Sequence, residues 1–73
     1  MINLGTTRDA VTSDTPNDQF NMVMVTTTSG SVSFDQEGGN TVVLTFVPVG
    51  VWVPVGNATN INTESTATGL MVV

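Results

Sequence analysis

The chain has 73 residues with one basic and six acidic side chains, so its formal net charge is −5. Nucleic acids and anionic membrane surfaces are bound through several Lys or Arg side chains, and a chain whose only basic residue is Arg8 is expected to bind neither. The sequence contains no His, Cys or Lys, which removes the usual catalytic bases, nucleophiles and zinc ligands, so we expect no enzymatic activity and no cofactor.

The composition predicts the fold class. Val and Thr each occur 13 times and together make up 26 of the 73 residues. Both are β-branched, and their restricted χ1 angles suit a pleated sheet better than a helix. We therefore predict an all-β fold, a small β-sandwich or jelly-roll-like barrel, with residues 20–73 as a single β domain and residues 1–19 as an extended N-terminal arm.

The arm has no apolar periodicity of the helical or the strand kind, which is typical of an extended segment. Its candidate docking residues are Ile2, Leu4 and Arg8. They would anchor the arm to a neighbouring protein, with the loss of chain entropy offset only on docking. A terminus without fixed structure is the alternative that the sequence leaves open.

The first strand is predicted from Phe20, where apolar and polar residues begin to alternate. The alternation places Phe20, Met22 and Met24 on one face of that strand. Its other face would carry Asn21, Val23 and Val25.

Two further strands are predicted on either side of an acidic, Gly-rich turn at residues 35–40. In residues 31–34 two apolar side chains share a face opposite two serines. In residues 41–47 the strict alternation places Val42, Leu44 and Phe46 on one face, with Val47 on the other.

The remainder of the chain is broken by Pro and Gly. Residues 48–50 interrupt the pattern, residues 51–55 resume an extended structure, and Gly56 with Asn57 is predicted to form a turn. A weak strand, a polar loop and a final apolar strand are expected at residues 57–62, 63–66 and 67–73. The apolar stretch at 42–55 is shorter than the ~20 residues of a membrane helix and contains two prolines, so we expect no transmembrane span.

A candidate subunit interface lies in the segment around the only Trp. A domain of this size buries only about 60% of the surface that its unfolded chain exposes, and without Cys it has no disulfides, so we expect a homo-oligomer. Alternation makes both faces of the segment apolar, and aromatic anchors are enriched at interface centres. The candidate interface residues are Val49, Val51, Trp52, Val53 and Val55. An ordinary core role for Trp52 is the alternative.

The acidic residues and the polar turns permit two other interpretations. Asp9, Asp14, Asp18, Asp35 and Glu37 are oxygen donors of the type that calcium prefers, but their spacing fits no calcium loop, so we expect no metal site. Asn-rich turns beside a single Trp would suit a glycan-binding face.

A set of short motifs occurs in order along the chain. They are Asp9-Ala10-Val11, Ser13-Asp14-Thr15, Gly38-Gly39-Asn40-Thr41-Val42, Phe46-Val47-Pro48-Val49-Gly50, Val53-Pro54-Val55 and Thr66-Ala67-Thr68-Gly69. This ordered set, which covers the chain from Arg8 to its end, resembles that of the small head-spike base proteins of tailed bacteriophages and of related gene transfer agents.

The resemblance implies a non-enzymatic virion structural protein, a head-spike base or capsid decoration subunit that assembles as a ring or cluster on the capsid. Its partners would be other copies of itself, the capsid protein and a spike fibre protein, and Ile2, Leu4 and Arg8 would form the capsid-docking arm. A receptor- or glycan-binding tip module of a phage fibre is the alternative.

Overall fold

The computed structural model describes residues 7–73 and is all-β, as predicted. One six-stranded sheet with the strand order β1-β6-β2-β5-β3-β4 contains every strand, and all neighbouring strands are antiparallel. The described part of the chain contains no helix. The strands are β1 Arg8–Asp9, β2 Phe20–Thr28, β3 Gly30–Gln36, β4 Thr41–Val47, β5 Trp52–Ile61 and β6 Thr68–Val72.

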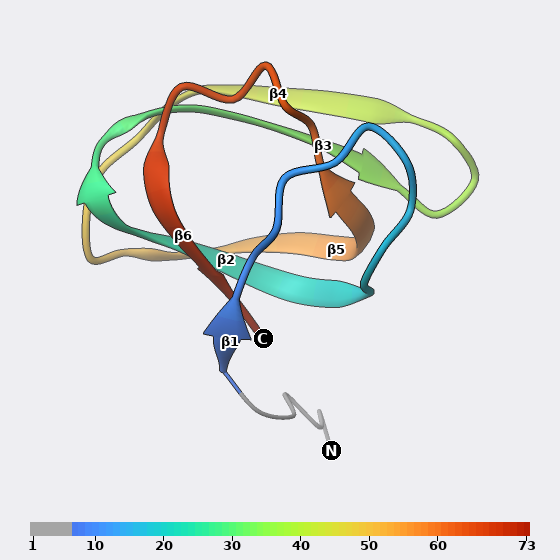
Figure 1. Cartoon of the computed structure of the whole chain (residues 1–73), viewed down its shortest axis with the longest axis horizontal. Helices are drawn as coiled ribbons and strands as arrows, with labels where there is room; N and C mark the ends of the chain where they lie inside the picture. Colours follow the sequence, from blue (N-terminus) through green and yellow to red (C-terminus); the bar gives the residue numbers. More distant parts are fainter. Residues whose placement is uncertain (1–6) are drawn as a thin grey trace.

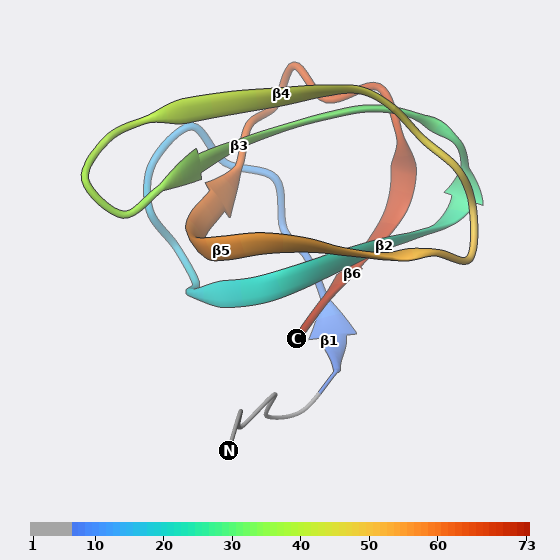
Figure 2. The same ribbon diagram turned by 180° about the vertical axis from the view of Figure 1, so that it is seen from behind.

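The sheet curls so that β3 and β4 form one layer and β2 and β5 form the other (Figures 1 and 2). Strand β5 connects the two layers, because its first half pairs with β2 and its second half pairs with β3. Gly56 and Asn57 lie between the two halves, and both have positive φ angles, 57° and 55°. The prediction of a chain reversal at Gly56 and Asn57 is wrong: these residues bend one long strand, which is how a strand passes from one layer to another.

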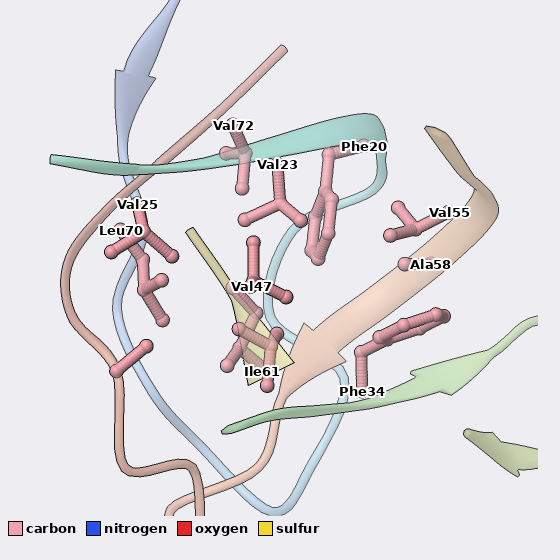
Figure 3. Close-up of a cluster of buried hydrophobic side chains, with 12 residues drawn as sticks. Phe20, Val23, Val25, Phe34, Val47, Val55, Ala58, Ile61, Leu70 and Val72 are labelled. Carbon is pink, nitrogen blue, oxygen red and sulfur yellow. The ribbon is translucent and has the colours of Figure 1, made fainter. Parts of the chain in front are cut away.

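The core fills the space between the layers (Figure 3). Side chains from β2 to β6 converge there, and Val23, Val25 and Val32 are completely inaccessible to solvent. The other members of this cluster are Phe20, Phe34, Val47, Val55, Ala58, Ile61, Ala67, Leu70 and Val72. Since Val and Ile supply most of the cluster, the β-branched composition serves core and strand formation together.

Two predictions of facing direction are wrong, and a register shift explains each. In β2 the pairing with β5 shifts between Phe20 and Met22, so Phe20 points into the core with Val23 instead of sharing a face with Met22. One residue lies between Gly30 and Val32 on β3, but two lie between their partners Val47 and Leu44 on β4. The extra residue turns Phe46 to solvent while Val47 enters the core. Such bulges reverse the side-chain alternation locally.

Residues 7–19 lie against the body of the domain. Strand β1 pairs with β6, and Ala10 N–H donates to Leu70 C=O at 2.9 Å. Farther along, Ser13 N–H donates to Ile61 C=O at 2.7 Å, and the N–H groups of residues 17 and 18 both donate to Thr59 C=O. This segment thereby crosses one side of the domain (Figure 1). The predicted docking residues Ile2 and Leu4 lie outside the described residues.

Candidate functional site

The predicted interface segment divides between the core and the surface. Val55 is 4% exposed and belongs to the core, and Val53 packs against that core, so neither is available to another chain. Val49 and Val51 are 48% and 47% exposed in the connection between β4 and β5. Trp52 is half-buried at the start of β5. The solvent-facing part of the predicted interface is therefore Val49, Val51 and Trp52.

Trp52 lies in a row of apolar side chains across three strands. Met24 of β2 is directly opposite Trp52 of β5 on one side and Met71 of β6 on the other. Directly opposed residues project to the same face of a sheet, and since Val23 faces the core, this row faces outward. Met22 of β2 and Pro54 of β5 are also directly opposite each other, and they lie two residues along the strands from this row. We call these five residues the methionine–tryptophan face.

A second exposed apolar region lies on β4 and the connection that follows it. Val43 is 55% exposed and Phe46 is 65% exposed, and Val49 and Val51 continue the region. Val43 points outward because it alternates with Val42 and Leu44, which pack against the core. Phe46 is exposed because of the register shift in β4 described above.

Charged side chains lie at the margins of both regions, since Asp9 is directly opposite Met71 and Asp35 is directly opposite Thr41. The sequence contains no charged residue from position 38 to position 63, a stretch that includes β4 and β5 entirely. The net charge of −5 therefore resides elsewhere, in the segment before residue 38 and at Glu64. Electrostatic repulsion of a second negatively charged protein at this surface would therefore come from the carboxylates at its margins.

A polar network occupies a different part of the molecule, where the segment 13–17 crosses β5. Its central residue is Asn60, which is fully buried and whose Nδ2 donates to Ser13 C=O, Asp35 Oδ2 and Asn62 Oδ1. Asn62 Nδ2 in turn donates to Ser33 Oγ and Asp35 Oδ1. The network thus fastens residues 13–17 to β3 and β5 with hydrogen bonds instead of apolar contacts.

Asp35 is the charged member of this network. Its Oδ1 accepts a hydrogen bond of 2.6 Å from Thr41 Oγ1, in addition to the bonds from the two Asn amides. The hydroxyl of Thr41 and the amides of Asn60 and Asn62 lower the pKa of the Asp35 carboxyl, since each donor stabilises the charged form. Because these donors occupy both oxygens, we assign Asp35 a structural role.

Asp35 also lines a surface pocket of about 450 Å³ together with Pro16, Glu37, Thr59 and Asn60. None of the residues lining this pocket is aromatic. A glycan held there would therefore have no aromatic platform, since Trp52 belongs to the outer face of β2, β5 and β6.

Arg8 faces the end of the arm segment. Its guanidinium forms an ion pair with Asp18, and Nη2 donates to Gln19 C=O at 2.6 Å. The hydrogen bond to Asp18 is the main cause that raises the pKa of Arg8. In this structure Arg8 holds both ends of the segment 8–19 together, and its predicted part in docking stays a prediction.

Comparison with known proteins gives no assignment: no family model, no curated protein and no solved structure matches the chain. In the described part of the chain, no helix is long and apolar enough to cross a membrane. Within residues 7–73, no three acidic side chains come together as a potential metal site.

The sequence analysis did not identify Val43 and Phe46 as exposed surface residues. It also did not place Met24 and Met71 in one row with Trp52. The exposure of Phe46 depends on a bulge for which the alternating sequence gives no signal. The row of Met24, Trp52 and Met71 depends on which strands are neighbours, and that order is not encoded locally. The uncharged stretch 38–63 is the sequence feature that coincides with the exposed apolar residues of β4 and of the connection that follows it.

Proposed function

We propose that the protein is a non-enzymatic structural subunit that associates with copies of itself and docks on a larger particle, as a head-spike base or capsid decoration protein of a tailed phage. The observation that carries the proposal is the exposed apolar surface within a stretch of 26 consecutive uncharged residues, 38–63. Contiguous exposed apolar side chains on a small soluble domain mark surfaces that other proteins cover.

The small size of the domain supports self-association. A domain of this length gains little net stability from its own core, and covering the exposed side chains of β4 and the β4–β5 connection would add apolar burial. Without Cys or His, the chain has neither disulfides nor a zinc site to add stability. Binding between native copies stabilises the folded state by mass action.

The chemistry of the site supports a non-enzymatic role. The chain lacks His, Cys and Lys, and the carboxylate of Asp35, which lines the surface pocket beside Pro16 and Thr59, accepts hydrogen bonds from three donors. The ordered motifs from Asp9-Ala10-Val11 to Thr66-Ala67-Thr68-Gly69 support the more specific proposal of a head-spike base or decoration protein.

The test is the presence of the chain in particles. Tailed particles are purified by density gradient from the strain that encodes the protein, washed in high salt, and analysed by quantitative mass spectrometry. We expect several copies of the chain per particle. Abundant protein in the lysate with none in washed particles would overturn the proposed function.

A pair of variants tests the docking arm within the same experiment. Replacing Ile2 and Leu4 together with Ser is expected to abolish incorporation into particles while leaving the fold of residues 7–73 intact. The matched control is Val11→Ser, which changes a side chain that is 71% exposed on the body. Equal incorporation of both variants would show that the arm does not dock the protein.

A further inference from the structure

Strand β4 forms one edge of the sheet and differs from the edge at β1. Its only neighbour is β3, and its backbone makes no hydrogen bond to any other segment within residues 7–73. It is seven residues long and contains no charge and no Pro, whereas β1 has two residues, both charged. Proteins protect open edges with short strands, charges, prolines or bulges. Strand β4 has no charge or Pro, and its bulge lies beyond Leu44, so residues 41–44 form a regular open edge.

The register with β3 determines which groups of β4 point to the open edge. Gln36 N–H donates to Asn40 C=O at 2.7 Å, so this pair exchanges hydrogen bonds across the β3–β4 ladder. In an antiparallel ladder such pairs alternate with pairs that are not bonded, so Val42 and Leu44 bond to β3. The N–H and C=O groups of Thr41 and Val43 therefore point to the open edge, and beyond Leu44 the register shift interrupts this alternation.

Thr41 and Thr45 flank Val43 at equal spacing, so β4 has the same residue type two positions away on each side of Val43. An edge with this symmetry is complementary to itself when a second copy is rotated by 180°. We propose that β4 pairs antiparallel with β4 of a second copy about a two-fold axis at Val43. This inference rests on the self-association in the proposed function and identifies its surface and register.

The pairing gives hydrogen-bond partners to the edge groups at the two-fold axis. Val43 of each copy exchanges two hydrogen bonds with Val43 of the other, and Thr41 of each copy lies opposite Thr45 of the other. Side chains on the outer face then meet as Val against Val and Thr against Thr, and both are favourable cross-strand pairs.

Charge and shape are compatible with the same register. Strand β4 itself carries no charge, and the carboxylate beside it, Asp35 on β3, lies directly opposite Thr41 and accepts a hydrogen bond from the Thr41 hydroxyl, two positions from the proposed axis. The register brings the exposed Phe46 beside Asn40 of the second copy, at the end of the hairpin turn.

Single cysteines test the register directly, because the chain has no Cys of its own. Val43→Cys places two thiols opposite each other on the two-fold axis, within the Cα separation of a disulfide. The matched control is Thr45→Cys, also exposed on β4, whose two copies would lie about 13 Å apart along the strands. We expect V43C to form disulfide-linked dimers at least about tenfold faster than T45C under mild oxidation.

Charge at the axis gives an independent measurement. Val43→Lys would place the positive charges of the two copies opposite each other at the axis, and we expect it to weaken association at least about tenfold in sedimentation equilibrium. The matched control is Val11→Lys, the same change at an exposed Val outside β4, which should leave association unchanged. Equal oxidation rates of V43C and T45C, in a wild-type protein that still associates, would overturn the β4 pairing and leave self-association intact. A wild-type chain that stays monomeric would overturn both.

Discussion

Replacing Asn60 with Ala tests whether the polar network holds residues 7–19 to the domain. The two amide hydrogens of Asn60 are shared among Ser13 C=O at 2.7 Å, Asp35 Oδ2 at 3.0 Å and Asn62 Oδ1 at 3.1 Å, and its Oδ1 accepts from Thr59 Oγ1 at 2.8 Å. The side chain is completely buried, so water does not replace these bonds. The two amide hydrogens make two hydrogen bonds at a time and Oδ1 accepts one, so N60A loses three hydrogen bonds. At about 1 kcal/mol each, they predict a loss of about 3 kcal/mol in the free energy of unfolding.

That loss is a large part of the total, since a domain of this length is stable by roughly 4 to 11 kcal/mol. Urea unfolding monitored by the fluorescence of Trp52, at one fixed protein concentration, should show the midpoint falling by about 2–3 M. Amide hydrogen exchange at Ser13 should accelerate more than exchange in β2, because Ser13 loses its anchor. The control is Asn40→Ala in the exposed hairpin turn, which should change stability by less than about 0.5 kcal/mol. A loss in N60A within about 1 kcal/mol of that control would refute the role given to the network.

Three other substitutions test separate parts of the structure. Gly69→Ala should destabilise the domain by about 2 kcal/mol more than Gly50→Ala in urea unfolding. Both glycines have positive φ angles, but only a Cβ at Gly69 would overlap the hydroxyls of Thr26 and Thr27. Equal losses of stability would contradict the close approach of β6 to β2. Asp35→Asn should flatten the pH dependence of stability below about pH 4. The lowered pKa of Asp35 contributes stability that is present above the ordinary pKa of 3.8 and is lost as the pH falls through the folded-state pKa. An unchanged slope of stability against pH in acid would argue against the three hydrogen-bond donors. Trp52→Ala should weaken self-association in sedimentation experiments if the methionine–tryptophan face is a second contact, and an oligomer of unchanged mass and affinity would exclude that face.

Local patterns predicted the strands well where the side-chain alternation is regular. Residues 41–47 form β4 as predicted, and the hairpin turn before it contains Gly38 and Gly39 with φ angles of 100° and 93°. The β-branched composition correctly predicted the all-β class. Each of these features depends on sterics within a few residues, so the sequence carries it locally.

Features that depend on distant partners were not predictable in this way. The inward direction of Phe20 and the outward direction of Phe46 come from register shifts between strands far apart in the chain. Likewise, Gly56 and Asn57 carry a turn signal, but the pairing of β5 with both β2 and β3 makes them a bend. The sequence of residues 10–19 did not predict that this segment packs against the domain. Hydrogen bonds to β5 and β6 hold the segment, so it has no apolar periodicity that a sequence pattern could reveal.

The role of residues 49–55 as a subunit interface stays a prediction. The structure assigns Val53 and Val55 to the core and leaves Val49 and Val51 exposed, a division that the apolar sequence alone does not show. The open edge of β4 depends on the strand order, in which β4 is last. Topology of this kind follows from the whole chain and not from any one segment.

Sedimentation equilibrium of the unmodified chain over a wide concentration range tests the central claim of self-association most directly. The account predicts that the average mass rises above 7.6 kDa with increasing concentration and that the thermal midpoint of unfolding rises with it. A mass of one chain at every concentration, with a cooperative unfolding transition that does not depend on concentration, would contradict it.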